Sequence, residues 1–230
     1  MGDFMYERGI APCGVAVETI YGADEKSAKV WKLFAMQIFS EAEGDYRAIT
    51  HLENGAPILE GIPKRISVSH TSHCMMIASL PKTPENNLET VNPRTALGID
   101  IEKADREQVI KIREKFLNED ELKIVVLSSD HDEPTEEEIK NNILAWTCKE
   151  ALYKAVMGKA PDWKEDYRII SLPAVARNMS HASPDKYGKG IIKTEAGEME
   201  MRLSSWEFEG HIVTLAFSEK IAKYHKASSL

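Results

Sequence analysis

The sequence predicts a mixed α+β fold, because short apolar stretches typical of strands and longer stretches with helical spacing occur in both halves of the chain. A polar segment from Pro81 to Pro93, with three prolines and three asparagines, separates the halves and predicts a linker or a long loop. The length of 230 residues allows one large domain or two small ones.

The first half is predicted to hold one helix and several short strands. Apolar residues recur at close to helical spacing between Asp24 and Glu43, which predicts the helix. Asn54 and Gly55 predict a turn with a short apolar stretch on either side. Strands are expected at 15–20, 66–68 and 75–80, the last two joined through 69–73.

The second half opens with a β run and then has two helix starts. Asp105 with Gln108 resembles a capping pair for a helix through Phe116. Asn118 with Glu121 is the pattern of a further short helix.

A longer helix is expected after an acidic loop at 128–138. Thr135 with Glu138 forms a capping box for a helix that runs towards Val156 and ends at Gly158. A charged helical tail is expected at the end of the chain. Strands in this half are expected at 96–102, 168–172, 190–194, 199–204 and 212–217.

Charge and cysteine usage restrict the class of protein. The formal net charge of −8 disfavours a nucleic-acid binder, which would normally be basic. Cys13, Cys74 and Cys148 are widely spaced and form no C-x-x-C pair, so we expect free thiols in a reducing cytoplasm. The N-terminus lacks a basic start and an apolar stretch, and no apolar run has membrane-spanning length. A cytoplasmic protein that binds neither membrane nor nucleic acid is expected.

Asp100 and Glu102 stand at i and i+2 in the predicted strand 96–102, so their side chains leave the same face. An acidic pair of this kind is common on exposed strands, where it only adds solubility. Here the neighbours are apolar, as in a buried strand, and two buried like charges are costly unless a cation joins them. The pair therefore indicates a metal site.

Glu150 and Lys154 stand at i and i+4 on the predicted helix, where they could form a solvent-facing ion pair of a few tenths of a kcal/mol. Trp146 precedes them by one turn, which favours a stripe that faces the protein. Three carboxylates and one ammonium from two elements suit a hard divalent cation that holds a phosphate.

A segment with Ser69 and His70 joins two predicted strands. A lone histidine is more often a structural hydrogen-bonding group than a catalyst. His70, His73 and Cys74 have no fourth ligand or matching pair nearby, which argues against zinc. We expect His70 to donate to a phosphate.

Taken together, these segments resemble the 4′-phosphopantetheinyl transferase superfamily. G-I-D-I-E at 98–102, W-T-C-K-E-A-L-Y-K at 146–154 and S-H-T at 69–71 are the main motifs. K-F-L-N-E-D-E at 115–121 is similar to the family segment R-F-F-x-x-x-E, and N-G-A-P at 54–57 is similar to its G-K-P turn. The length fits the longer, pseudo-dimeric branch, which acts on carrier proteins.

The resemblance implies a pseudo-two-fold pair of similar α+β subdomains, each with helix and antiparallel-type sheet, and an active site at their junction. Residues 1–97 would form the N-terminal subdomain, with coenzyme A contacts, and 98–230 the C-terminal subdomain, with the metal site and transferase motifs. It also implies transfer of the phosphopantetheine arm of coenzyme A to a serine of an apo-acyl or peptidyl carrier protein, with release of adenosine 3′,5′-bisphosphate. A monomer would suffice.

The resemblance also assigns roles to residues of this chain. Mg²⁺ would be the cofactor and coenzyme A the co-substrate. Lys154 would balance phosphate charge, while Ser69 and His70 hold coenzyme A. Glu150, directly or through a metal-bound water, would accept the serine proton, and His70 and Lys154 complete the catalytic set. The metal ligands would be Asp100, Glu102 and Glu150.

Two departures from the family pattern concern basic residues. Ala56 stands where the G-K-P turn has a basic residue, so Lys64 or Arg65 would have to supply that phosphate contact. Lys115 replaces an arginine, which weakens any two-pronged contact there.

Two other functions use the same residues. One is a metal-dependent phosphohydrolase, and the other is a non-catalytic paralogue that binds carrier protein or coenzyme A without turnover. Carrier proteins are typically acidic, as is this chain, so a local basic or apolar patch around 111–127 would have to direct docking.

Overall fold

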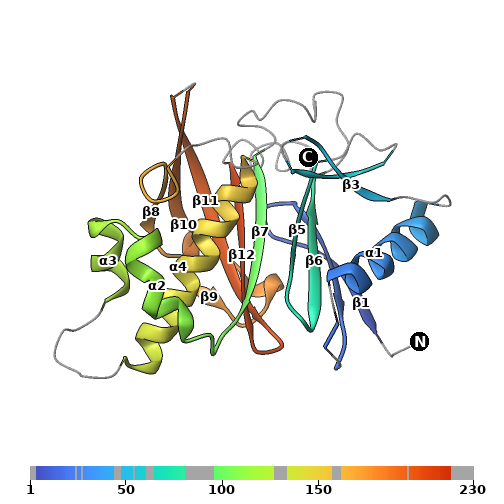
Figure 1. Ribbon diagram of the computed structural model, residues 1–230, viewed down its shortest axis with the longest axis horizontal. Coiled ribbons are helices and arrows are strands. Elements are labelled where there is room, and N and C mark those ends of the chain that lie inside the picture. Colours follow the sequence, from blue (N-terminus) through green and yellow to red (C-terminus); the bar gives the residue numbers. More distant parts are fainter. Residues whose placement is uncertain are drawn as a thin grey trace.

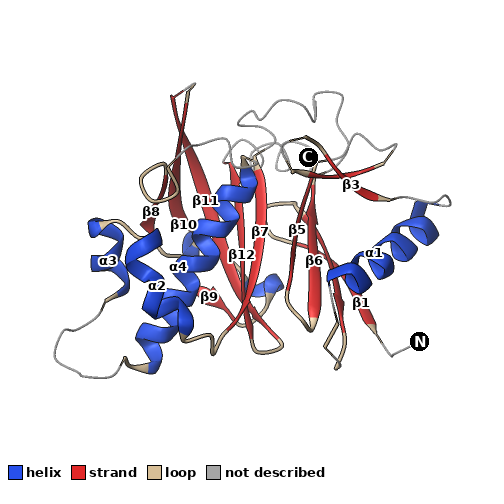
Figure 2. Cartoon of the chain, viewed as in Figure 1, coloured by secondary structure: helices blue, strands red, loops and turns tan. Residues whose placement is uncertain are grey.

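The computed structural model describes residues 4–23, 25–26, 28–43, 48–53, 55–60, 65–80, 96–126, 134–156, 162–195 and 197–218. Within these ranges the fold is mixed α+β, as predicted, with two main antiparallel sheets that lie next to each other (Figure 1). Helix α1 lies beside the first sheet, and α2, α3 and α4 lie on one side of the second (Figure 2). The boundary at 97/98 and a two-fold relation between the halves stay predictions.

The first sheet has the strand order β1-β2-β6-β5. Trp31 and Ala35 of α1 pack with Ile20, Ile66 and other apolar residues of this half in one core cluster. Strand β1 was not predicted, because nearly all its residues are exposed and show no alternation of burial. The elements are β1 (Met5–Ile10), β2 (Ala16–Tyr21), α1 (Ala28–Glu43), β3 (Ile49–His51), β4 (Pro57–Leu59), β5 (Ile66–His70) and β6 (Cys74–Ser79).

The second sheet has the order β7-β12-β11-β10-β8, with β9 added parallel to β11. All the strands predicted in this half are present, and β11 extends beyond the predicted 199–204 at both ends. The strands are β7 (Leu97–Lys103), β8 (Tyr167–Ser171), β9 (Val175–Ala176), β10 (Gly188–Thr194), β11 (Gly197–Phe208) and β12 (His211–Ser218), with short 3₁₀ turns at Met179–His181 and Pro184–Lys186.

Two of the three predicted helix starts are confirmed. Asn118 caps α3 (Glu119–Val125) through a capping box with Glu121. Thr135 caps α4 (Glu136–Ala155) in the same way with Glu138. These reciprocal bonds satisfy N–H groups that the first helical turn leaves without partners.

The third predicted start is wrong by two residues. Helix α2 (Gln108–Phe116) has Glu107 at its cap position, with no side-chain cap bond. Asp105 instead lies in the turn that follows β7, so it does not pair with Gln108 as a cap.

Several predicted features lie outside the described residues. They are the linker at 81–93, most of the acidic loop, the helix stop at Gly158, the charged tail, and positions Asn54 and Lys64.

The three cysteines are buried and unpaired, which confirms the prediction of free thiols. Among the described helices, none combines the length and apolar character needed to cross a bilayer.

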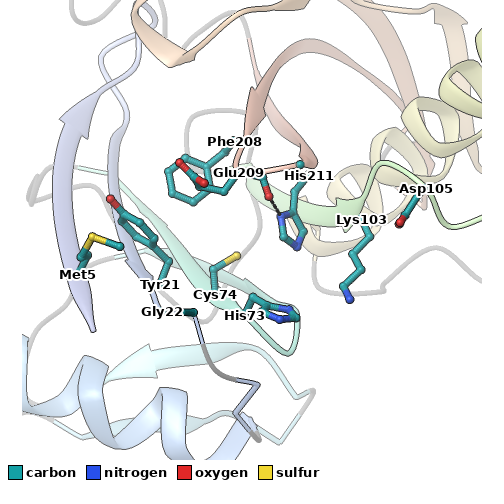
Figure 3. Close-up of a pocket in the computed structure, with 12 residues that line it drawn as sticks. Met5, Tyr21, Gly22, His73, Cys74, Lys103, Asp105, Phe208, Glu209 and His211 are labelled. Carbon is teal, nitrogen blue, oxygen red and sulfur yellow. Dashed lines mark hydrogen bonds between the residues drawn. The ribbon is translucent and has the colours of Figure 1, made fainter. Parts of the chain in front are cut away.

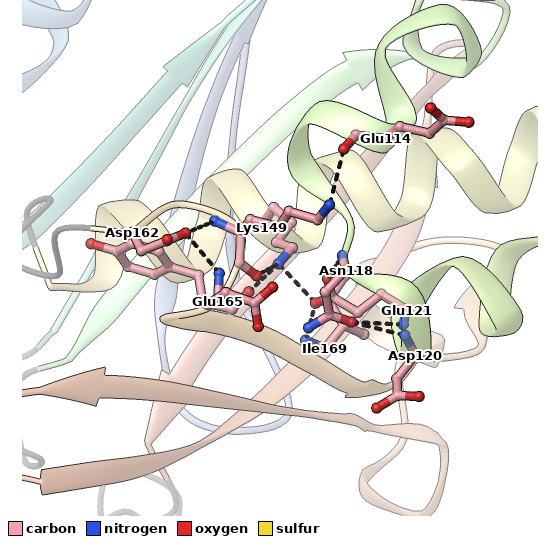
Figure 4. Close-up of polar contacts among 10 residues, drawn as sticks. Glu114, Asn118, Asp120, Glu121, Lys149, Asp162, Glu165 and Ile169 are labelled. Carbon is pink, nitrogen blue, oxygen red and sulfur yellow. Dashed lines mark hydrogen bonds and ion pairs between the residues drawn. The ribbon is translucent and has the colours of Figure 1, made fainter.

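A buried ion pair ties α3, α4 and the start of β8 together (Figure 4). Lys149 Nζ lies 2.8 Å from Glu121 Oε1, and both side chains are almost completely buried. Burial lowers the pKa of Lys149, and the charge of Glu121 opposes that shift. The Lys149 ammonium also donates to the carbonyls of Lys164 and Tyr167, while Glu121 accepts the Ile169 N–H. Hydrogen bonds to the backbone therefore stabilise both charges of this buried pair.

Replacing Lys149 by methionine is expected to cost about 3–5 kcal/mol of unfolding free energy, because it leaves the Glu121 carboxylate buried without its cation. The double variant Lys149→Met with Glu121→Gln should recover part of that loss, since no charge is left unpaired. Urea denaturation of the wild type and the variants measures both quantities. A single variant as stable as the wild type would contradict the predicted pairing.

Candidate active site

Strand β7 presents Asp100 to helix α4. Alternate residues of a strand share a face, so Gly98, Asp100 and Glu102 point the same way. A Cβ atom on Gly98 would lie 1.9 Å from the Ala151 carbonyl oxygen and 2.7 Å from the Ala155 nitrogen. The backbone of α4 therefore lies directly against β7 at this glycine.

Ser69, Asp100 and Lys154 form a closed set of polar contacts. Lys154 Nζ lies 2.6 Å from Asp100 Oδ1 and 3.0 Å from Ser69 Oγ. The Ser69 hydroxyl donates to the same Asp100 oxygen at 2.8 Å. Strands β5 and β7 and helix α4 thus bring together three of the six predicted site residues, from both halves of the chain.

Glu102 lies one alternate position further along β7. One of its carboxylate oxygens accepts the backbone N–H of Lys103, and the other is paired with Arg106. No three His, Cys, Asp or Glu side chains gather into a ready metal site within the described ranges. The pairing of Glu102 with Arg106 was not predicted from the sequence.

Glu150 is influenced by both acids of β7. Burial, together with the charges of Asp100 and Glu102, raises the pKa of Glu150 to about 7, and the charges of Lys154 and Arg106 oppose this shift. Asp100 and Glu102 therefore both lie close enough to Glu150 to act on its charge, and a metal site shared by the three carboxylates stays a prediction. Their mutual repulsion is the property that a divalent cation would relieve.

His70 is exposed and lies near two cations. Its pKa is lowered by burial of the ring and by the charges of Lys154 and Lys32, and Asp100 opposes this shift. Burial and Lys32 also lower the pKa of His51. Lys32 belongs to α1 and was not predicted as a site residue, because its proximity arises from packing between segments distant in sequence. Lys32 and Lys154 therefore place positive charge around His70, and we call this the basic region.

The face of β5 that meets the second half is polar. Ser67 and Ser69 accept the N–H groups of Ile99 and Ile101 on β7, at 3.0 and 3.3 Å. Arg65, just before β5, donates to the carbonyls of Lys154 and Ala155 at the end of α4. We call these three residues (Arg65, Ser67 and Ser69) the β5 seam.

Arg65 is not available to supply the phosphate contact that is missing at Ala56, because its side chain is already bonded within the protein. Only 5% of Arg65 is exposed, and its Nη2 is engaged with α4. Burial lowers the pKa of Arg65 to about 10.

The stripe on α4 begins with a ring contact, as expected for a face that meets the protein. Trp146 packs edge-on against Phe116 with ring centroids 5.0 Å apart. Phe116 belongs to the K-F-L-N-E-D-E segment, so this motif serves to hold α2 against the helix that carries Glu150 and Lys154.

A separate pocket of about 580 Å³ opens between the halves (Figure 3). Tyr21, His73, Lys103, Phe208 and His211 are among the residues that line it. It contains none of the six predicted site residues. The His211 ring bonds to the Glu209 carbonyl and to the Thr71 hydroxyl, which fixes one wall.

Comparison with known proteins supports the resemblance found in the motifs. Residues 96–187 match the family model of the 4'-phosphopantetheinyl transferase superfamily, which confirms the resemblance over this region. The matched region contains Asp100, Glu102, Glu150 and Lys154, whereas Ser69 and His70 lie before it. No curated protein matches the chain.

Proposed function

We propose that this chain, whose residues 96–187 match a superfamily of phosphopantetheinyl transferases, acts as a Mg²⁺-dependent holo-carrier-protein synthase. It transfers the 4′-phosphopantetheine arm of coenzyme A to a serine of an apo-carrier protein and releases adenosine 3′,5′-bisphosphate. The observation that carries the proposal is that Asp100, Glu150 and Lys154 of the matched region share one partly buried neighbourhood.

The residues present fit a magnesium ion. Asp100, Glu102 and Glu150 offer carboxylate oxygens, the ligands that Mg²⁺ prefers, and the charges of Asp100 and Glu102 add to burial in raising the pKa of Glu150. These three residues would hold the ion, and Glu102 would exchange its bond to Arg106 to do so. When bound, Mg²⁺ neutralises charge on the pyrophosphate of coenzyme A.

The protein residues orient the reactants and place charge. Lys154 neutralises phosphate charge, and Ser69 holds the Lys154 ammonium and the Asp100 carboxylate in position. Lys32 and Lys154 place positive charge around His70, which would attract the phosphate groups of coenzyme A. A direct contact between Ser69 and coenzyme A stays a prediction.

The transfer step is an in-line displacement at the phosphorus that carries the pantetheine arm. A bond forms between the carrier serine Oγ and this phosphorus, and the bond to the bridging pyrophosphate oxygen breaks. Glu150 is the group that accepts the serine proton. The electron pair of the broken bond leaves with adenosine 3′,5′-bisphosphate.

Helix α2 provides a place for the carrier protein to dock. Lys111 and Lys115 stand one turn apart on α2, and both are exposed. They give this otherwise acidic chain a local cationic strip that suits an acidic partner.

The proposal is tested by incubating candidate apo-carriers with the protein, coenzyme A and Mg²⁺, followed by intact-mass spectrometry. The carrier should gain the mass of the arm in the presence of Mg²⁺ and gain none in EDTA. A carrier whose target serine is replaced by alanine is the control.

The same assay separates the competing functions. Cleavage of coenzyme A without mass gain on any carrier identifies a phosphohydrolase. Binding of coenzyme A, seen by calorimetry, without cleavage or transfer identifies a non-catalytic paralogue. Either result contradicts the proposed transfer.

A further inference from the structure

Arg65 is a buried cation whose described side-chain partners are backbone carbonyls. Its Nη2 donates to the Lys154 carbonyl at 3.1 Å and to the Ala155 carbonyl at 3.2 Å. No ion pair among the described residues includes Arg65, and its Nε has no hydrogen-bond partner. Burying an arginine that has no carboxylate partner among the described residues costs free energy. Its hydrogen bonds to the carbonyls of α4 must therefore offset that cost.

The end of α4 is where such a cation stabilises a helix most. The last carbonyls of a helix have no intrahelical partner, and the helix dipole places partial negative charge there. Helix α4 ends at Ala155, where the N–H of Val156 turns back to the Lys154 carbonyl. Arg65 adds a second donor to that carbonyl and one to the next.

Lys154 is consequently held at two points by the β5 seam. Arg65 binds its backbone carbonyl, and Ser69 binds its ammonium, which also meets Asp100. Arg65 and Ser69 stand four positions apart on the same face of an extended segment, so one strand sets both contacts. A free lysine side chain loses rotamer freedom when it is fixed, and an anchored backbone reduces the part of the side chain that must be ordered during binding.

We propose that Arg65 is a positioning residue, which fixes the last turn of α4 and so sets the place of the Lys154 ammonium against Asp100. The kinetic part of this inference rests on the proposed function, whereas the placement of Lys154 does not.

The first experiment measures placement without any substrate. Short exposure to acetic anhydride, followed by peptide mass spectrometry, gives the acetylation rate of each lysine. Lys154, whose side chain is 26% exposed and bonded, should react slowly, and Lys123, 72% exposed, is an internal reference. In Arg65→Met we expect Lys154 to react several-fold faster and Lys123 to stay unchanged. Arg168→Met, at the partly exposed Arg168–Glu198 pair, is the matched control and should change neither rate.

The second experiment measures transfer kinetics for the same variants. A misplacement of about 1 Å can cost on the order of 100-fold in rate, so kcat of Arg65→Met should fall by roughly 10- to 100-fold. KM for coenzyme A should change much less, because the basic region near His70 and Lys32 is intact. Arg65→Lys retains the positive charge but not the planar guanidinium with its several donors, and should give intermediate values in both experiments.

The outcomes separate this inference from the proposed function. Unchanged Lys154 acetylation in a folded Arg65→Met protein overturns the inference. If Arg65→Met does not fold, Arg65→Lys decides: a faster Lys154 reaction supports the inference, and an unchanged rate overturns it. If the wild type modifies no carrier, the proposed function fails, and the acetylation rates still decide the role of Arg65.

Discussion

Replacing Glu150 by glutamine is expected to lower the transfer rate by about 10²–10⁴-fold, the range in which a general base acts, while coenzyme A binding stays measurable. Glu150 lies in the field of Asp100 and Glu102, and the amide removes both a metal-ligand charge and a proton acceptor. Intact-mass kinetics and calorimetry of coenzyme A binding measure the two effects. Transfer near the wild-type rate would rule out both roles for Glu150.

Magnesium dependence distinguishes the two roles. If Glu150 is mainly a ligand, the variant needs much more Mg²⁺ and is partly rescued by excess ion. If it is mainly the base, the Mg²⁺ requirement is unchanged and excess ion does not help. Glu200→Gln, at an exposed position of β11, is the matched control and should behave as the wild type.

Stability provides a further check that Glu150→Gln does not act by unfolding. The pKa of Glu150 is raised to about 7 in the fold, so the carboxyl holds its proton more tightly there than in the unfolded chain. The free energy of unfolding therefore falls as pH rises from the ordinary carboxyl pKa of 4.5 to the folded-state pKa of about 7. Above pH 7 the charged Glu150 carboxylate makes the wild type less stable. In EDTA above pH 7, the melting temperature of the variant should be no lower than that of the wild type.

Gly98→Ala is expected to be among the most destabilising single substitutions in the chain. The new Cβ would overlap backbone atoms of Ala151 and Ala155, which cannot rotate away. Overpacking of this kind costs about 1–3 kcal/mol and occasionally more, and we expect the upper part of that range. Displacement of α4 would also move Glu150 and Lys154 from Asp100, so transfer should fall in the fraction that remains folded. Urea denaturation and the intact-mass assay measure both effects.

Gly9→Ala is the matched control. A Cβ on Gly9 would meet only the end of the Met179 side chain, which is flexible and can move. The cost should stay below about 1 kcal/mol, and transfer should be unchanged. Equal stability of Gly98→Ala and Gly9→Ala would contradict the close packing of α4 on β7.

Local signals in the sequence predicted most of the elements. The capping boxes Asn118–Glu121 and Thr135–Glu138 are contacts within four residues, so the local sequence is enough to predict where these helices begin. Strand β1 gave no such signal, because an exposed edge strand needs no apolar alternation. The two residues of strand β9 are too short for any periodicity.

The sequence predicts those pairs of site residues that lie on one strand or one helix, because their spacing along the chain fixes their common face. Asp100 and Glu102 follow from strand alternation, and Glu150 and Lys154 from the helical repeat. The roles of Arg65 and Lys32 were not predictable, because the first depends on where α4 ends and the second on how α1 packs. Both are long-range consequences of the fold.

The serines of the β5 seam also determine which partners β7 can accept. An open strand edge presents unpaired N–H groups that a peptide from another protein can use to extend the sheet. On β7 the N–H groups of Ile99 and Ile101 already bind Ser67 and Ser69, while β12 occupies the opposite side. A strand from another protein therefore cannot pair with β7 here, so a carrier protein that docks beside Asp100 would have to be recognised at this strand through side chains.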